Sequence, residues 1–224
     1  MSIVTLEVAG KDNYYVEEAI KVLRTNIQFS GNDMKVILFT SCGENEGKTT
    51  VALHVAKSFA ELGKKVLFID ADMRKSMVAA RNAKTKNTKG LSEVLTKQEN
   101  ISDCLLKVES SSLMMLLAGT VPPNPVELLS SKSFDSLISA SRSSFDYVII
   151  DTAPLGIVVD AAVVADKCDG CVLVISDKRN TIKREKEVIA MIRKTDCKIL
   201  GAVRNYSRGA TDKGYYKKYK KYEK

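Results

Sequence analysis

The sequence predicts an α/β fold with a doubly wound, mostly parallel sheet and helices on both of its faces. Two observations support this prediction. Short, almost continuous apolar runs alternate with longer segments of helical periodicity, as is typical of parallel strands that are buried on both sides. Polar or glycine-rich turns follow the runs, at 41–47, 70–72 and 151–154. Because crossovers between parallel strands are right-handed, we expect an αβα sandwich.

The expected elements follow in order along the chain. An amphipathic helix at 14–29 precedes the first apolar strand at 34–40. The next helix, at 48–62, has apolar residues at helical spacing and ends at Gly63. We expect further strands at 65–69, 113–118, 147–150, 171–175 and 198–203, and further helices at 125–144, 160–166 and 181–195.

Length and charge divide the chain into a body and a tail. The 224 residues, 45% of them hydrophobic, fit one domain at 1–205 followed by a tail at 206–224. Of the net charge of +8, most lies in 204–224, which holds eight basic and two acidic residues. The tail has almost no aliphatic residues, so we expect it to be mobile. Because no apolar run approaches the ~20 residues of a membrane span, we expect a cytoplasmic protein, and a near-neutral body predicts no nucleic-acid partner.

A glycine-rich segment joins the first strand to the helix that begins at Lys48. It ends in the Gly-Lys-Thr of a P-loop, and the surrounding elements are those of a P-loop NTPase. Amides at the helix N-terminus bind phosphate, Lys48 reaches the β- and γ-phosphates, and the Thr49 hydroxyl ligates Mg²⁺. Cys42 replaces the usual first glycine, so we hypothesise that ATP binding is sensitive to thiol reagents. The predicted nucleotide ligands of this segment are Gly43, Glu44, Asn45, Glu46, Gly47, Lys48, Thr49 and Thr50.

Three aspartates follow two other strands of the predicted sheet. Asp70 and Asp72 end one strand, and Asp151 ends another in a Walker-B-like pattern. The carboxyl ends of parallel strands form the ligand-binding edge of an open sheet. We therefore expect Asp72 and Asp151 to hold Mg²⁺ together with Thr49, and Asp70 or Asp72 to act as a base, with Asp70 preferred. The predicted catalytic residues are Lys48, Asp70, Asp72 and Asp151.

The identity of the nucleobase rests on one residue. The Asn-Lys-x-Asp motif expected of a GTPase is replaced by Val-Arg-Asn-Tyr at 203–206. The side-chain amide of Asn205 can hydrogen-bond an adenine edge, which favours ATP. The alternative is that Asn205 belongs to a simple turn at the strand end.

Four tyrosines stand within eight residues of the basic tail, at Tyr215, Tyr216, Tyr219 and Tyr222. As phosphoacceptors they would add ~1.5 to 2 negative charges each, enough to reverse the sign of the tail. As an aromatic, basic patch they would instead bind anionic lipid or nucleic acid. Composition alone does not choose between these two functions.

Together, these motifs resemble those of the bacterial tyrosine kinases of capsule and exopolysaccharide synthesis, the BY-kinases. The helix of that family that lines a subunit interface, Glu-x-x-Arg-x-x-Arg, is matched by Glu18, Lys21 and Arg24, with lysine in the middle position. The resemblance covers nearly the whole chain, through the P-loop at 41–49, Asp-Ala-Asp-Met-Arg at 70–74, Pro-Pro-Asn-Pro-Val-Glu-Leu-Leu at 122–129, Asp-x-x-Pro at 151–154 and the tyrosine tail.

The resemblance implies a Mg-ATP-dependent kinase of the short form, which phosphorylates the tail tyrosines of a neighbour within a ring-shaped homo-oligomer. It also implies a transmembrane activator that holds the protein at the inner face of the membrane, a phosphotyrosine phosphatase, and a role in polysaccharide polymerisation or export. Because lysine lacks the planar bidentate contacts of arginine, Lys21 is expected to weaken the ring.

Two other functions stay open. A partitioning or division-site ATPase of the ParA/MinD type has a second lysine five positions before the P-loop lysine, where this chain has Gly43. An ATP-binding, ring-forming scaffold of a membrane polysaccharide complex would keep the P-loop without turnover. Against this alternative, the residues expected for catalysis are intact, namely Lys48, Asp70, Asp72 and Asp151. Phosphate on a tail tyrosine would distinguish a kinase from both.

Overall fold

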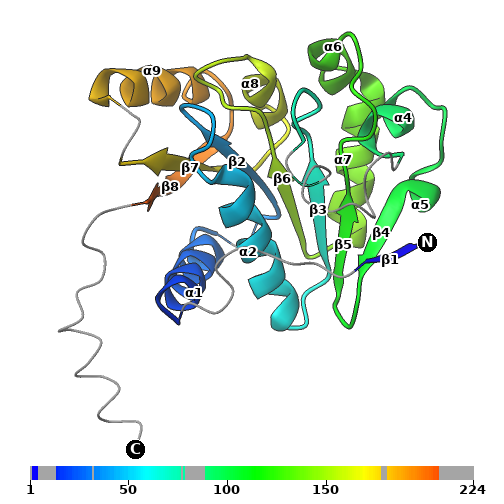
Figure 1. Cartoon of the computed structure of the whole chain (residues 1–224), viewed down its shortest axis with the longest axis horizontal. Coiled ribbons are helices and arrows are strands. Elements are labelled where there is room, and N and C mark those ends of the chain that lie inside the picture. The colour runs from blue at the N-terminus through cyan, green and yellow to red at the C-terminus, as the bar shows by residue number, and fades with distance from the viewer. Residues whose placement is uncertain are drawn as a thin grey trace, which may run out of the picture.

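A sheet of eight strands lies between two layers of helices (Figure 1). The computed structural model describes residues 2–4, 14–31, 33–76, 78, 89–177 and 181–206. In the order of the sheet, the strands of this part are β1 (Ser2–Val4), β4 (Leu105–Val108), β5 (Leu113–Leu116), β3 (Val66–Asp70), β6 (Tyr147–Asp151), β2 (Val36–Ser41), β7 (Gly170–Ser176) and β8 (Lys198–Asn205).

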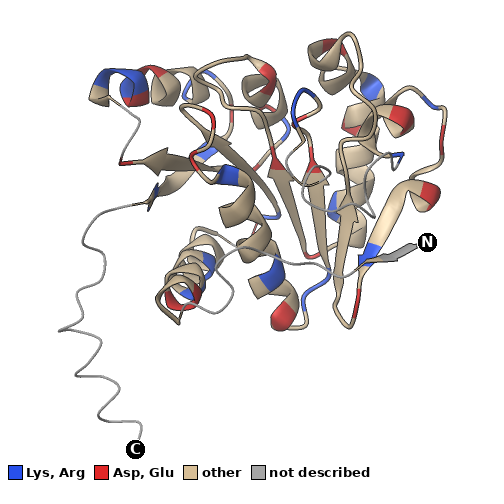
Figure 2. Cartoon of the chain, viewed as in Figure 1, with Lys and Arg blue, Asp and Glu red and all other residues tan. Residues whose placement is uncertain are grey.

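Every neighbouring pair of strands is parallel except β4 and β5, which are antiparallel. The expectation of a mostly parallel sheet is therefore confirmed. The strands β3, β6 and β2 are neighbours, so the segments that follow them meet at one edge. Figure 2 shows acidic residues at the tips of β3 and β6, and Lys48 begins the helix that follows β2.

Helices cover both faces of the sheet. On one face lie α1 (Tyr14–Phe29) and α2 (Lys48–Glu61). The other face is covered by α4 (Leu91–Leu95), α7 (Lys132–Ser144), α8 (Asp160–Ala165) and α9 (Ile182–Ile192), with the short α5 (Ile101–Cys104) and α6 (Pro125–Leu129) beside them.

Alternate side chains of the central strands pack into two separate cores. On β2, Val36 and Leu38 belong to the core under α7, α8 and α9, whereas Ile37 and Phe39 belong to the core under α1 and α2. All six residues of β2 are buried. A strand that is buried on both faces reads as an unbroken apolar run, which explains why this strand was predictable.

Two features differ from the expected elements. The helix expected at 125–144 is two helices, because α6 ends at Leu129 and the Ser131 hydroxyl accepts the N–H of Phe134 to begin α7. The strands β1 and β4 and the helices α4 and α5 were not expected, since each spans at most five residues. Residues 207–224, including the four tail tyrosines, lie outside the described residues, so the expected domain boundary stays a prediction.

Candidate active site

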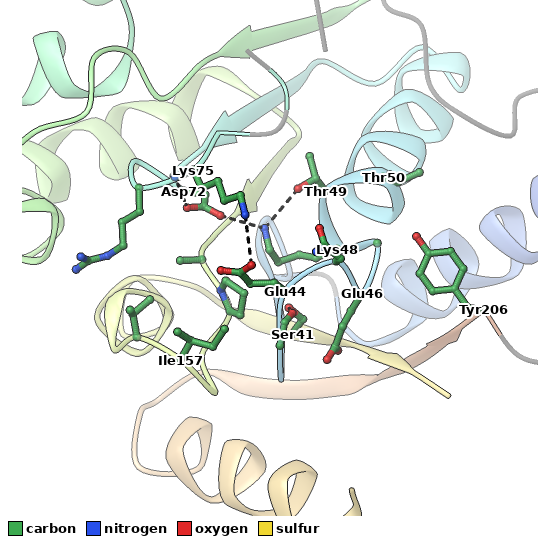
Figure 3. A pocket seen from close by; sticks show the side chains of 17 residues that line it. Ser41, Glu44, Glu46, Lys48, Thr49, Thr50, Asp72, Lys75, Ile157 and Tyr206 are labelled. Carbon is green, nitrogen blue, oxygen red and sulfur yellow. Dashed lines mark hydrogen bonds and ion pairs between the residues drawn. The ribbon is translucent and has the colours of Figure 1, made fainter. Parts of the chain in front are cut away.

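A cavity opens at the edge of the sheet where β2, β3 and β6 end (Figure 3). All eight residues of the segment from Gly43 to Thr50 line it, and Asp72, Arg74 and Pro154 are among the other residues of its wall. The predicted nucleotide ligands of the P-loop therefore line one cavity, and their role stays a prediction. The N-terminus of α2 faces this cavity, and helix N-termini attract phosphate through their amides and their dipole.

The turn before α2 has a conformation that glycine allows. Gly47 has a φ of 85° and a ψ of 13°, in the left-handed region. A β-carbon at this position would lie 2.0 Å from Nδ2 of Asn205. Gly47 therefore permits both the turn and the close approach of β8 to the P-loop.

Lys48 lies between the two carboxylates that the sequence analysis assigned to the metal. Its Nζ is 2.7 Å from Oδ1 of Asp151 and 3.9 Å from Oδ2 of Asp72. The Thr49 hydroxyl donates to Oδ2 of Asp151 over 2.6 Å. Asp151 is only 1% exposed, and a buried carboxylate needs such partners. The structure thus brings together four of the predicted site residues.

Asp70 takes a different position from Asp72. It is fully buried and does not line the cavity. Its Oδ2 accepts from the Ser76 hydroxyl at 2.5 Å and its Oδ1 accepts from the Asp72 N–H at 3.1 Å. Burial and the nearby Asp151 raise the pKa of Asp70 to about 7. Asp70 therefore ties the two ends of the loop that carries Asp72.

Asp72 reaches the cavity. Burial raises its pKa above the usual value, against the opposing effect of Lys48 and of the N–H of Lys75, which donates to Asp72 over 3.1 Å. Of the two aspartates considered as a base, Asp72 is thus the one with access to a ligand. Sequence reasoning had preferred Asp70, because spacing along a strand end does not tell which side chain turns outward.

Arg74 and Asp160 form a contact that the sequence analysis missed. The guanidinium donates from Nε and Nη2 to the two carboxylate oxygens of Asp160, over 2.8 and 3.0 Å. Asp160 begins α8 and is 0% exposed. This pair joins the loop after β3 to the loop after β6. The only signal in the sequence was an aspartate at a helix start.

Asn205 braces the P-loop from β8. Its Nδ2 donates to the carbonyl of Glu46 over 2.9 Å, and its Oδ1 accepts the N–H of Tyr206 over 3.0 Å. Tyr206, rather than Asn205, lines the cavity. The signal that could have identified Tyr206 as part of the cavity wall was its aromatic ring directly after Asn205, at the end of the strand.

The three residues of the expected subunit interface lie on α1. Lys21 and Glu18 pair with each other at 2.6 Å on the exposed side of the helix. Arg24 instead turns toward α2, where it donates to the hydroxyl and the carbonyl of Ser58 over 2.8 and 3.2 Å. Glu18 and Lys21 thus pair on the surface, while Arg24 joins the two helices within the chain, and the subunit interface stays a prediction.

Comparison with known proteins identifies the family. The sequence profile of the AAA domain family matches residues 34–196. The tyrosine-protein kinase CpsD of Streptococcus pneumoniae is 40% identical over 228 aligned positions, which cover 97% of this chain and 99% of that protein. The chain belongs to this family of bacterial tyrosine-protein kinases. The resemblance to the BY-kinases that its motifs indicated is confirmed.

Solved structures agree with this membership. The kinase domain of the Escherichia coli tyrosine kinase ETK superposes on this BY-kinase with a TM-score of 0.84 at 29% identity, covering 93% of this chain and 84% of that one. The cell division ATPase MinD of Pyrococcus furiosus matches with a TM-score of 0.64 at 22% identity, over 80% of this chain and 74% of that one. The likeness to MinD shows the P-loop NTPase fold alone. None of the helices in the described ranges is long and apolar enough to cross a membrane.

Proposed function

We propose that this BY-kinase transfers the γ-phosphate of ATP to tyrosines in the tail of a neighbouring copy, and so regulates capsular or exopolysaccharide synthesis or export. The proposal is supported by the gathering of Lys48, Thr49, Asp72 and Asp151 at one cavity beside the N-terminus of α2. The proposed acceptors are Tyr215, Tyr216, Tyr219 and Tyr222.

The P-loop would bind the phosphates. Amides of the segment from Gly43 to Thr50 would hold the phosphate oxygens, and Lys48 would move from Asp151 toward the β- and γ-phosphates. Tyr206, which lines the cavity near Gly47, would mark the end that takes the adenine base, and Asn205 would support this end from behind the P-loop.

The residues at the cavity also fit Mg²⁺. Thr49, Asp72 and Asp151 offer a hydroxyl and two carboxylates, the oxygen donors that this hard cation prefers, with phosphate oxygens to complete its shell. The ammonium group of Lys48 lies between the carboxylates of Asp72 and Asp151. Its position indicates that positive charge is favoured at this point of the cavity. When bound, Mg²⁺ supplies neutralisation of the charge on the transferring phosphoryl group.

The chain's own residues would then position and deprotonate the acceptor. A bond forms between the phenolic oxygen and the γ-phosphorus, the bond to the β,γ-bridging oxygen breaks, and ADP leaves. Phosphoryl transfer proceeds through a loose transition state, so positioning and charge matter most. Asp72 would accept the phenolic proton on a carboxylate oxygen that the metal does not occupy, and Asp70 would hold the loop that carries Asp72.

The proposed partners follow from family membership. A ring-shaped homo-oligomer would use Glu18, Lys21 and Arg24 on α1, with Arg24 acting through its contact to α2. A transmembrane activator would hold the kinase at the inner face of the membrane, and a phosphotyrosine phosphatase would reverse the reaction.

Mass spectrometry tests the proposal. Purified protein is incubated with Mg-ATP, and phosphate is mapped on all tyrosine-containing peptides for the wild type and for Lys48→Met. Lys57→Met is the matched control, since Lys57 lies on the same helix and pairs with Glu61 away from the cavity. We expect phosphate on tail tyrosines in the wild type and the control, and none in Lys48→Met. ATP hydrolysis with an unmodified tail, even after addition of the activator's cytoplasmic segment, would favour an ATPase switch. An unmodified tail without hydrolysis would favour the scaffold.

A further inference from the structure

The rim of the cavity carries an exposed apolar side chain that phosphate binding does not require. Ile157 lines the cavity although it is 51% exposed. It belongs to the turn at 154–159, between β6 and α8, together with Pro154 and Val158, which also line the cavity. Val159, two residues further on, is 52% exposed but is not part of the cavity wall. Large apolar side chains exposed at a ligand cavity commonly contact a ligand.

This turn is held firmly against the P-loop. The N–H groups of Ile157 and Val158 both donate to the carbonyl of Pro154, over 3.0 and 3.1 Å. A β-carbon on Gly156 would lie 2.1 Å from the carbonyl oxygen of Cys42, so the two loops are in direct contact. On the other side, Arg184 of α9 donates to the carbonyl of Gly156 over 3.2 Å. Ile157 is therefore presented by a fixed turn.

The place of Ile157 in the cavity indicates what it contacts. Figure 3 shows Ile157 on one side of Lys48 and Tyr206 on the other. Because the proposed function puts the nucleoside beside Tyr206, Ile157 lies on the other side of Lys48, where the terminal phosphate and the acceptor would be. In-line transfer requires the acceptor oxygen to approach from the side opposite the leaving oxygen. The acceptor therefore enters past Ile157.

We infer that Pro154, Ile157 and Val158 form a platform for the phenol ring of the acceptor tyrosine and select tyrosine over serine and threonine. This inference rests on the proposed kinase function. The occupant is a tyrosyl side chain from the tail of a second copy. Its ring can bury apolar surface on the platform, whereas serine has no ring and gains nothing there. The hydroxyl of a tyrosine packed in this way would lie in the cavity that Asp72 also lines.

The test measures acceptor affinity separately from ATP affinity. The enzyme is the full chain with its four tail tyrosines replaced by phenylalanine, and the acceptor is a synthetic peptide of residues 211–224. Rates are measured against peptide concentration for Ile157→Ser, with Ile157→Val as the conservative variant. Val159→Ser is the matched control, because Val159 is equally exposed on the same turn. ATP affinity is measured for each variant, which also reports correct folding.

We expect Ile157→Ser to raise the KM for the peptide about tenfold or more, the range for an altered apolar contact, with ATP affinity unchanged. Ile157→Val and Val159→Ser should keep the parent KM. A peptide with serine at the four tyrosine positions should be a poor acceptor for the parent enzyme. In Ile157→Ser, the ratio of the phosphorylation rates of the tyrosine peptide and the serine peptide should be smaller than in the parent. Equal peptide KM values for Ile157→Ser and Val159→Ser would overturn the platform and leave the kinase intact. A parent enzyme that binds Mg-ATP but phosphorylates no peptide would overturn the kinase function and the platform with it.

Discussion

Arg74 and Asp160 connect the two loops that carry the candidate metal ligands. The guanidinium of Arg74 donates two hydrogen bonds to the fully buried carboxylate of Asp160, over 2.8 and 3.0 Å. Arg74 lies two residues after Asp72, and Asp160 begins α8, which follows the loop from Asp151. Bidentate contacts of this kind fix both distance and orientation. The pair therefore sets Asp72 and Asp151 relative to each other.

Asp160→Asn should raise the Mg²⁺ concentration that the kinase needs for phosphorylation. Because the Arg74 side chain left behind is 41% exposed, the loss of stability should be that of a charged hydrogen bond, about 1.5–3 kcal/mol, and activity is measured well below the melting temperature. Because Asp72 loses its fixed position, we expect a higher Mg²⁺ concentration for half-maximal phosphorylation, with kcat partly restored at saturating Mg²⁺. Asp169→Asn, which removes an ion pair at the opposite edge of the sheet, is the control. The same Mg²⁺ dependence in both variants would contradict this role.

Gly47→Ala should abolish nucleotide binding, whereas Gly63→Ala should not. Both glycines have positive φ, of 85° and 75°, which costs an alanine about 1–2 kcal/mol. A β-carbon on Gly47 would collide with Asn205 at 2.0 Å, while one on Gly63 would meet nothing within 4 Å. Binding of a fluorescent ATP analogue by each variant provides the measurement. Wild-type affinity in Gly47→Ala would show that Asn205 does not brace the loop.

Asp169 should stabilise the fold only above acidic pH. Burial alone would raise its pKa, but hydrogen bonds from Arg142 and from the N–H groups of Lys35 and Val36 outweigh burial and lower it below the ordinary 3.8. A lowered folded pKa contributes stability above the unfolded pKa that is lost as pH falls through the folded value. We therefore expect Asp169→Asn to cost about 1.5 kcal/mol at pH 7.

The difference in the free energy of unfolding between the wild type and Asp169→Asn should shrink as the pH falls below 3.8. Denaturant unfolding at several pH values measures it. A difference that grows toward acid would contradict the direction of the pKa shift.

Cys42 should resist alkylation in the folded protein. It is fully buried, and burial, followed by the charge of Glu46, raises its pKa to about 12. Only the thiolate reacts, and its fraction at pH 8 would be on the order of one in ten thousand. We expect iodoacetamide to modify Cys42 only after unfolding and to leave ATP affinity unchanged. The structure therefore argues against the thiol sensitivity that the position of Cys42 suggested. Rapid labelling of Cys42 in the folded protein would contradict this expectation and support the hypothesis that ATP binding is sensitive to thiol reagents.

The sequence predicted what depends on continuous patterns. The sequence predicts the buried strand β2, the P-loop and the helix after it. In this part of the chain an apolar run, glycines at the turn and helical spacing follow one another directly. The short β4 and α5 were not readable, because four residues carry too little periodicity. The break before α7 had a signal in Ser131, a favourable N-cap, that the continuous helical spacing outweighed.

Within the candidate site, the sequence predicted which residues gather but not how each side chain turns. Asp70 and Asp72 are two positions apart, yet one is tied inside the protein and the other faces the cavity. The side chain of Asn205 hydrogen-bonds the backbone of Glu46 and of Tyr206. Arg74 pairs with Asp160, 86 positions later in the chain, a contact that no local pattern encodes.

A mixing experiment tests the central claim most directly, namely that one copy phosphorylates the tail of another. Isotopically labelled Lys48→Met chain, with its tail intact, is mixed with unlabelled chain whose Tyr215, Tyr216, Tyr219 and Tyr222 are replaced by phenylalanine. After incubation with Mg-ATP, tail peptides are read by mass. The account predicts phosphotyrosine on the labelled chain in the mixture and none when either chain is incubated alone. A labelled chain that stays unmodified, under conditions where the wild-type chain phosphorylates its tail, would contradict transfer between copies.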